Sequence, residues 1–228
     1  MLQYGNEWVA PEFKEAFLQG LREGAAPVPA TPHQGGFIYR DPRTRATLAK
    51  VTILVWTILG ALVTSIDLAT PDSAPDEFTA ADGALAFFGL AMLPTFILSV
   101  VFFCMWTHRV MANSYALGGK WNEITPGWAV GWYFIPFANL VKPYHGLKQA
   151  WQSTHDDPDV PALLPTWWGL WIVSNIAGNI SMRLTMNDMP EAATMVDMIT
   201  LAIDFPLLYC VWQVISRLTN QQISKVAG

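Results

Sequence analysis

Ionisable and amide side chains inside two apolar segments are the first candidates for chemistry. Asp197 and Asp204 both fall in the apolar segment 192–214, at a spacing that places them on one face of a helix. The preceding apolar segment carries Asn175 and Asn179, and Arg183 follows directly. Polar groups in a membrane are costly and are usually paired or functional. The pattern predicts either a proton or cation site or, as the simpler interpretation, a polar seam between two antiparallel helices.

The run 121–151 is a second candidate, because it is rich in tryptophan, proline and glycine. In a helix, Trp128, Trp132 and Asn139 share one stripe, with Lys142 close to lipid phosphates. Such a stripe predicts a cleft for a lipid headgroup or small amphiphile. The alternative is an aromatic wedge that anchors a broken helix, since Trp and Tyr gather at membrane interfaces. The candidate residues for a ligand, lipid or partner are Trp128, Trp132, Pro136, Asn139, Lys142, Pro143, Tyr144 and Trp151.

Catalytic and metal-binding patterns do not occur in the sequence. It contains no P-loop, no dinucleotide-binding glycine pattern, no G-x-S-x-G and no H-E-x-x-H motif. The histidines lack the paired spacing of metal ligands. A haem held by His108 and His145 is not expected, because axial histidines face each other from packed helices and these two belong to different segments. We therefore expect no enzyme activity, no metal and no cofactor.

The composition places the chain in the membrane class. Of its 228 residues, 52% are hydrophobic and only 14% are charged. The net charge of -5, with Lys and Arg dispersed along the sequence, argues against nucleic acid as a partner, because neutralising phosphates requires a concentrated basic surface. Cys104 and Cys210 both lie in apolar segments, so no disulfide framework is expected.

Four apolar segments are long enough to cross a bilayer, because about 20 helical residues span a hydrocarbon core of about 30 Å. They predict an all-α fold, a polytopic membrane helical bundle of four transmembrane helices with a broken re-entrant or interfacial helical element at 121–151. Three tryptophans at the start of the third segment predict an interfacial belt. The predicted spans are 46–68, 83–107, 163–182 and 192–214, and the belt residues are Trp167, Trp168 and Trp171.

The segment 126–141 is not expected to cross the bilayer. As a helix it extends only about 24 Å, and Pro136 interrupts its hydrogen bonds. If this segment returns to the side it left, every Lys and Arg except Arg183 lies on one side of the membrane. By the positive-inside rule that side is the cytoplasm, and both termini lie there.

The remaining segments flank the membrane domain, which we place at 46–218. Pro11 can begin an amphipathic helix within 1–23, since Phe13, Phe17 and Leu21 recur at four-residue spacing. Residues 24–45 combine a proline- and glycine-rich linker with a basic flank. Residues 219–228 are expected to form a cytoplasmic tail.

The central motif also carries a family resemblance. Trp128, Trp132 and Pro136 are followed by Asn139 and then by the triplet Lys142, Pro143 and Tyr144. This pattern, with apolar segments on either side, resembles the bacterial membrane family called domain of unknown function 4328, over about residues 46–218. The resemblance implies a multi-pass protein of the bacterial cytoplasmic (inner) membrane. It implies no activity, because fold alone does not specify function.

Two hypotheses of function follow. The first is a non-catalytic scaffold or accessory subunit that docks on a larger membrane complex, with a membrane protein or a second copy of the chain as partner. The second is a lipid or small-amphiphile binding protein, or a small transporter, that uses the 128–144 cleft or the Asp204 face. Four spans form a small bundle for transport, which favours the first.

Overall fold

The computed structural model describes residues 2–4, 7–9, 36–70 and 79–227. Near the N-terminus, strand β1 (Leu2–Tyr4) pairs antiparallel with β2 (Glu7–Val9). Within the segment 1–23, only these two strands are described. The amphipathic helix predicted to begin at Pro11 lies outside the described residues. The same holds for the linker up to residue 35.

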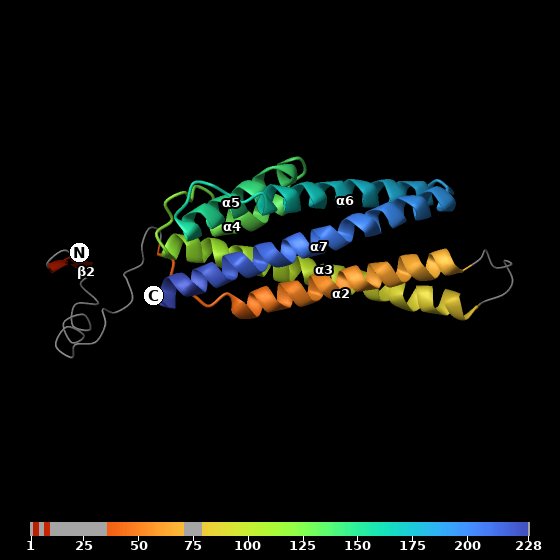
Figure 1. The fold of residues 1–228 in the computed structure, drawn as a ribbon, viewed down its shortest axis with the longest axis horizontal. Coiled ribbons are helices and arrows are strands. Elements are labelled where there is room, and N and C mark those ends of the chain that lie inside the picture. Colours follow the sequence, from red (N-terminus) through yellow and green to blue (C-terminus); the bar gives the residue numbers. More distant parts are fainter. Residues whose placement is uncertain (1, 5–6, 10–35, 71–78, 228) are drawn as a thin grey trace.

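Four long helices form the body of the molecule (Figure 1). Helix α2 packs along α3, helix α6 packs along α7, and a contact between α2 and α7 joins the two antiparallel pairs. Each of the four contains one of the segments predicted from hydropathy, but α3 and α7 extend beyond theirs, and α7 includes residues 219–227 of the predicted tail. Their bounds are α2 Arg43–Ala69, α3 Ala80–Ala116, α6 Leu163–Met186 and α7 Pro190–Ala227.

Three of these helices, α2, α3 and α7, are long and apolar enough to cross a membrane. Helix α6 has 24 residues, which is sufficient length, but tryptophan and asparagine side chains lower its hydropathy. Large apolar side chains remain exposed along the same helices, as expected where the surrounding solvent is lipid rather than water. Examples are Phe87, Leu90, Leu93, Ile176, Ile199 and Phe205.

Local sequence signals set the helix ends. Helix α3 begins with a capping box, in which the Thr79 hydroxyl accepts from the Asp82 amide and the Asp82 carboxylate accepts from the Thr79 amide. It ends where Gly118 and Gly119 adopt positive φ angles, which glycine tolerates best. Helix α4 (Pro126–Gly131) starts with Thr125 as its cap and Pro126 in the first turn.

The segment after α3 returns to the end of the bundle from which it started. Helix α4 leads into two short 3₁₀ turns, and α5 (Lys142–His155) runs back. The Trp121 amide donates to Ser153 Oγ, and the Gln149 side chain accepts from the amides of Glu123 and Ile124. The beginning of the segment is therefore bonded to its end. The predicted break is present, since the helix does not continue through Pro136.

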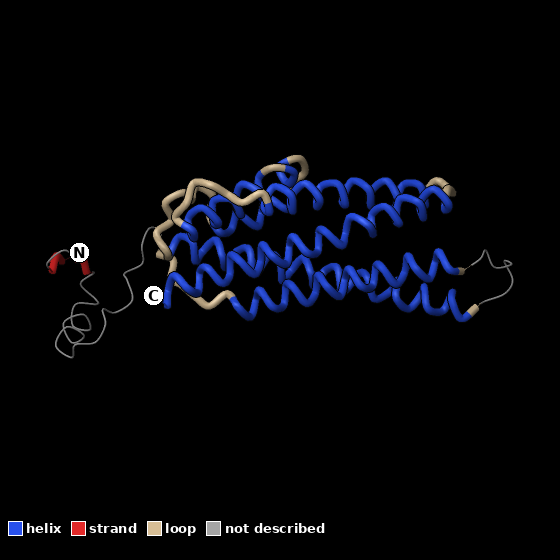
Figure 2. Tube along the Cα trace, in the orientation of Figure 1, coloured by secondary structure: helices blue, strands red, loops and turns tan. Residues whose placement is uncertain are grey.

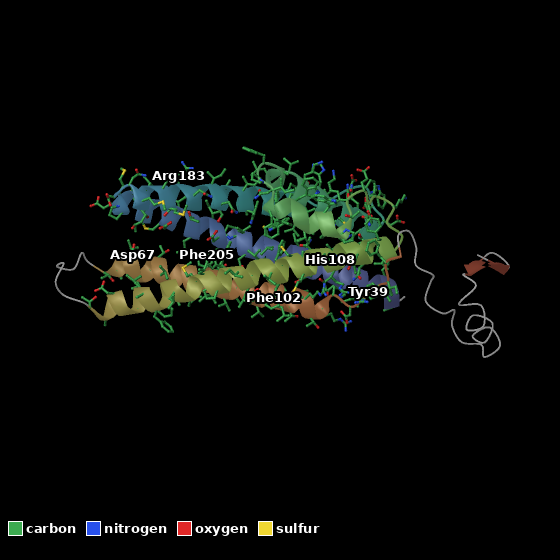
Figure 3. The ribbon with its side chains drawn as sticks, turned by 180° about the vertical axis from the view of Figure 1, so that it is seen from behind. Tyr39, Asp67, Phe102, His108, Arg183 and Phe205 are labelled. Carbon is green, nitrogen blue, oxygen red and sulfur yellow. The ribbon has the colours of Figure 1, made fainter. Side chains whose placement is uncertain are left out.

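The buried apolar core lies at one end of the bundle, the end where the loops gather (Figure 2). It combines the start of α2, the second half of α3, helices α4 and α5, the start of α6 and the second half of α7. Its most completely buried large side chains are Trp106, Met111, Leu147, Leu164, Ile215 and Leu218. Toward the other end, where Asp67 and Arg183 lie opposite Tyr39 and His108, the helices carry few buried residues (Figure 3).

A buried hydrogen-bond network holds the core end together. The Gln222 side chain donates to the Val110 carbonyl at 2.8 Å and to Thr154 Oγ1 at 3.2 Å. Its Oε1 accepts from Asn113 Nδ2 at 3.0 Å, and Asn113 exchanges two further bonds with the backbone of Arg40. Gln222 and Asn113 are fully buried. This network connects α3, α5, α7 and the segment that precedes α2.

Replacing Gln222 by alanine should lower the free energy of unfolding by about 1–3 kcal/mol, because the buried Asn113 amide and Val110 carbonyl lose partners. The measurement is thermal unfolding of the purified chain in detergent. The matched control is Gln221→Ala, because Gln221 lies on the same helix and is only partly buried. Equal melting temperatures for the two variants would contradict this role of Gln222.

Candidate functional site

A cavity of about 640 Å³ lies between the α2–α3 pair and the α6–α7 pair. This volume is within the range of small-molecule sites. Its walls are mostly apolar, and they include Trp56, Phe96, Phe103, Trp167, Trp171 and Leu207. A smaller group of polar side chains enters from all four long helices, namely Thr57, Ser99, Ser174, Asn175, Asn179, Thr200 and Asp204.

Asp204 is the only acidic residue that lines this cavity among the described residues. Its Oδ1 accepts a hydrogen bond from Ser174 Oγ at 2.7 Å, which joins α7 to α6. Asp204 does not cap a helix end, because α7 continues through Pro206 without interruption. The carboxylate therefore has one protein donor and further acceptor positions beside the cavity.

The other predicted intramembrane polar residues divide into two groups. Asn175 and Asn179 line the cavity, but their amide nitrogens donate to the carbonyls of Trp171 and Asn175 on their own helix. Their side-chain oxygens remain as acceptors. Asp197 and Arg183 are not among the lining residues, and within the described part of the chain neither takes part in an ion pair.

Tyr133 closes the core end of the cavity. Its ring makes edge-on contacts with Phe103 of α3 and with Trp168 and Trp171 of α6. The hydroxyl is buried, and among the described residues the Thr107 hydroxyl lies close to it but makes no hydrogen bond of regular geometry with it. Burial raises the pKa of the Tyr133 phenol, so the group remains a neutral O–H donor. A buried polar group of this kind is an available partner for a bound molecule.

The predicted aromatic stripe is only partly formed. Trp128 and Trp132 stack with ring centroids 4.7 Å apart, and the Lys142 ammonium lies over the Trp132 ring at 5.8 Å. Beyond Gly131 the helix tightens into 3₁₀ turns, so the helical spacing is lost. Asn139 consequently folds back, and its Nδ2 donates to the Tyr133 carbonyl at 3.4 Å.

The tip of this segment is apolar and exposed. Phe137 is 87% exposed and has a φ of 63°, which is uncommon for a residue with a side chain. Pro136 precedes it, and Phe134, Leu140 and Val141 are also exposed. These side chains form a surface suited to contact with lipid.

Three other candidates from the motif belong to the core end. Pro143 and Trp151 are buried, and the ring of Tyr144 lies 6.4 Å from that of Trp168. The positions of Pro143 and Tyr144 indicate packing, whereas Trp151 also lines a separate pocket at the core end.

The predicted interfacial belt is wrong for two of its three tryptophans. Trp167 and Trp168 are 2% and 6% exposed. The Trp167 ring packs on Phe103 of α3, whereas the segment 131–141 lies against Trp168, whose Nε1 donates to the Leu140 carbonyl at 3.0 Å. Trp168 also stacks on Trp171, with ring centroids 4.6 Å apart. This packing explains why Trp168 faces inward although its residue type is common at membrane interfaces.

Sequence reasoning missed Tyr133 and Ser174. Tyr133 falls outside the stripe defined by Trp128 and Trp132, and it faces the cavity because the helix changes its winding after Gly131. Ser174 lies directly before Asn175. The sequence signal that could have identified it is that it is a polar residue on the helix expected to pair antiparallel with the helix of Asp204.

The histidines considered for haem are both exposed, His108 on α3 and His145 on α5. In the part of the chain that the structure describes, no group of three His, Cys, Asp or Glu side chains is placed to hold a metal ion.

A family model described as "Domain of unknown function (DUF4328)" matches residues 69–220. The match includes helices α3 and α6, most of α7, the segment 121–155, and the cavity-lining residues of these elements, but it leaves out nearly all of α2. No curated protein and no solved structure matches the chain.

Replacing Tyr133 by phenylalanine should not lower the melting temperature, because the change removes a buried hydroxyl without a hydrogen bond of regular geometry and keeps the ring contacts. Replacing it by alanine should cost about 3–5 kcal/mol through loss of those contacts. The measurement is thermal unfolding in detergent. A clear loss of stability in Tyr133→Phe would show that the hydroxyl is already bonded within the protein.

Proposed function

The chain belongs to the DUF4328 family, whose description names no activity, and we propose that it is a non-catalytic membrane protein that binds a small amphiphile between its two helix pairs. The observation that carries this proposal is the cavity beside Asp204, which joins apolar walls to a few convergent polar groups. That combination is typical of ligand sites in proteins.

The cavity walls favour a hydrophobic body. Phe103, Trp167 and Trp171 supply flat aromatic surface, and aliphatic side chains from α2 and α7 supply the rest. An alkyl chain in this space exchanges contact with lipid for contact with protein, so the apolar part alone gives little selectivity. The polar groups must therefore provide the specificity.

The polar groups favour a ligand that donates hydrogen bonds. Asp204 retains acceptor positions after its bond to Ser174, and the side-chain oxygens of Asn175 and Asn179 are acceptors as well. An amine or alcohol group satisfies these acceptors, whereas a carboxylate beside Asp204 meets repulsion between like charges. The Tyr133 hydroxyl offers a single donor at the core end.

The membrane arrangement that fits this site has four crossings, in which α6 crosses the membrane beside α7, in addition to α2 and α3. The segment 121–155 then enters the cytoplasmic interface with its exposed tip and returns. Basic residues at the core end, including Arg45, Lys50, Arg109 and Arg217, support a cytoplasmic position for that end and for both termini. The bacterial inner membrane is the location that follows.

A scaffold or accessory subunit is the second candidate function. The exposed apolar tip around Phe137 supports it, because a large unpaired apolar surface also suits a protein partner. We place the scaffold function second for two reasons. Contact with lipid explains the exposed tip equally well, and a scaffold function does not explain the polar groups in the cavity.

Replacing Asp204 by asparagine should weaken binding of dodecylamine by about tenfold, because an amine loses its charged acceptor. Native mass spectrometry of the protein released from maltoside micelles counts the bound molecules. Asp197→Asn is the matched control, since Asp197 lies on the same helix and outside the cavity lining. The proposal fails if the parent protein retains no more dodecylamine than dodecanoic acid, or if both variants bind like the parent.

A cysteine at Lys148 should react with a membrane-impermeant maleimide only from the cytoplasmic side. Lys148 lies on α5, which in this arrangement faces the cytoplasm. The assay requires replacement of Cys104 and Cys210, and a cysteine at Arg183 serves as the opposite-side control. Labelling of Lys148→Cys from outside would support five crossings instead of four.

A further inference from the structure

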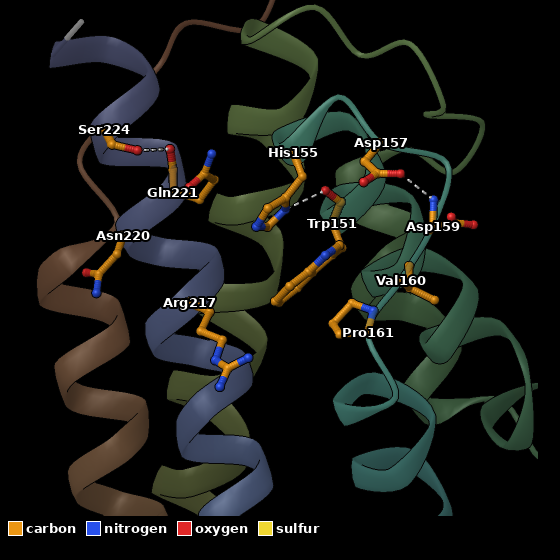
Figure 4. Close-up of a pocket in the computed structure, with 10 residues that line it drawn as sticks. All are labelled: Trp151, His155, Asp157, Asp159, Val160, Pro161, Arg217, Asn220, Gln221 and Ser224. Atoms are coloured by element: carbon orange, nitrogen blue, oxygen red, sulfur yellow. Dashed lines mark hydrogen bonds between the residues drawn. The ribbon is translucent and has the colours of Figure 1, made fainter.

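A second pocket, of about 710 Å³, lies at the core end between α7 and the loop that follows α5 (Figure 4). It does not share a lining residue with the Asp204 cavity. Unlike that cavity, it is lined by charged and polar side chains from both walls, notably His155, Asp157, Asp159, Arg217, Asn220 and Gln221.

One wall is a flat aromatic surface in a fixed position. The rings of Trp151 and His155 stack with centroids 4.3 Å apart and an interplanar angle of 13°. His155 Nδ1 lies 2.9 Å from the Trp151 carbonyl, which can only accept, so Nδ1 carries a proton. In the neutral ring Nε2 is then an acceptor, and Figure 4 shows the ring directed toward α7.

Opposite charges line this pocket without neutralising each other. The ion pairs found in the described part of the chain are Arg43 with Asp41 and Lys120 with Asp156, so Arg217 and the two pocket carboxylates are outside them. The Arg217 Nε donates to Gln213 at 3.3 Å, which leaves the two terminal nitrogens as donors. The Asp157 carboxylate accepts from the Asp159 amide, and the Asp159 carboxylate accepts no hydrogen bond from the residues that the structure describes.

The charges are ordered along the bundle axis. Arg217 lies about 10 Å before Ser224 along α7, at a rise of about 1.5 Å per residue, and so closer to the apolar part of that helix. Asp157 and Asp159 lie nearer than Arg217 to the C-terminal end of α7 (Figure 4). In the membrane arrangement proposed above, on which this inference rests, Arg217 lies closer to the lipid than the two carboxylates do.

We propose that this pocket binds a phosphate joined to a primary ammonium by a short linker, the chemistry of a phosphoethanolamine headgroup. Arg217 holds the phosphate through charge-assisted hydrogen bonds. Asp157, Asp159 and His155 Nε2 accept from the ammonium, which has three donors. The order of the charges matches that of an amino-phospholipid in the inner leaflet, whose phosphate lies closer to the acyl chains than its amine does.

The test is isothermal titration of the full chain in maltoside micelles with dihexanoyl phosphatidylethanolamine. Dihexanoyl phosphatidylglycerol, which has the phosphate and lacks the ammonium, should bind about tenfold more weakly. Arg217→Gln should weaken binding of both lipids by about tenfold. Asp159→Asn should weaken only the ethanolamine lipid. Arg183→Gln, the same substitution at the far end of the bundle, should leave both affinities unchanged.

Free phosphoethanolamine distinguishes the two sources of this headgroup. If it binds as tightly as the short-chain lipid, the natural ligand is a soluble metabolite. If binding requires the acyl chains, the ligand is a membrane lipid.

Equal affinity for the two lipids, or an Arg217→Gln variant that binds like the parent, would overturn the proposal. Neither outcome depends on the Asp204 cavity, because Arg217 and Asp159 do not line it.

Discussion

The hydrogen bonds of Gln222 are the constraint on which the arrangement of the helices depends. A buried amide with unsatisfied groups is costly, so Gln222 must meet its partners on α3 and α5 in one position. Asn113 extends the same requirement to the segment before α2. Apolar packing alone permits small shifts of one helix along another, whereas this set of directional bonds fixes their relative heights.

The cavity lies away from the end of the bundle that carries the buried core and the Gln222 network. The α2–α3 and α6–α7 pairs are each in contact along their lengths, and α2 meets α7, but the network and the core lie near the loops. Away from that end, α3 and α6 line opposite sides of an open space, into which Ser174 and Asp204 point their joined side chains. Tyr133 closes this space at the core end, because the segment 121–155 returns beside α6. The broken segment is thus a structural wall of the site rather than the site itself.

Much of this architecture was predictable because it depends on local signals. Hydropathy located the four helices, and Pro136 predicted the break in the central segment. The sequence predicted a polar contact between the helix of Asp204 and α6, because polar side chains on adjacent membrane helices usually bond to each other. The partner itself, Ser174, depends on helix rotation, which hydropathy does not determine. The inward position of Trp168 and the role of Tyr133 depend on how a 3₁₀ turn at 132–134 rotates the chain, and no spacing rule for a regular helix describes that.

The sequence separations within the Gln222 network have a kinetic consequence. Each helix pair is an antiparallel hairpin of neighbouring segments, so it can form through contacts that are close along the chain. The bond from Asn113 to Gln222 instead joins residues 109 positions apart, and that from Gln222 to Val110 joins residues 112 apart. Because long-range contacts form slowly, we expect the two hairpins to assemble first and to dock last. The bonds that fix the final structure are then absent during most of its formation.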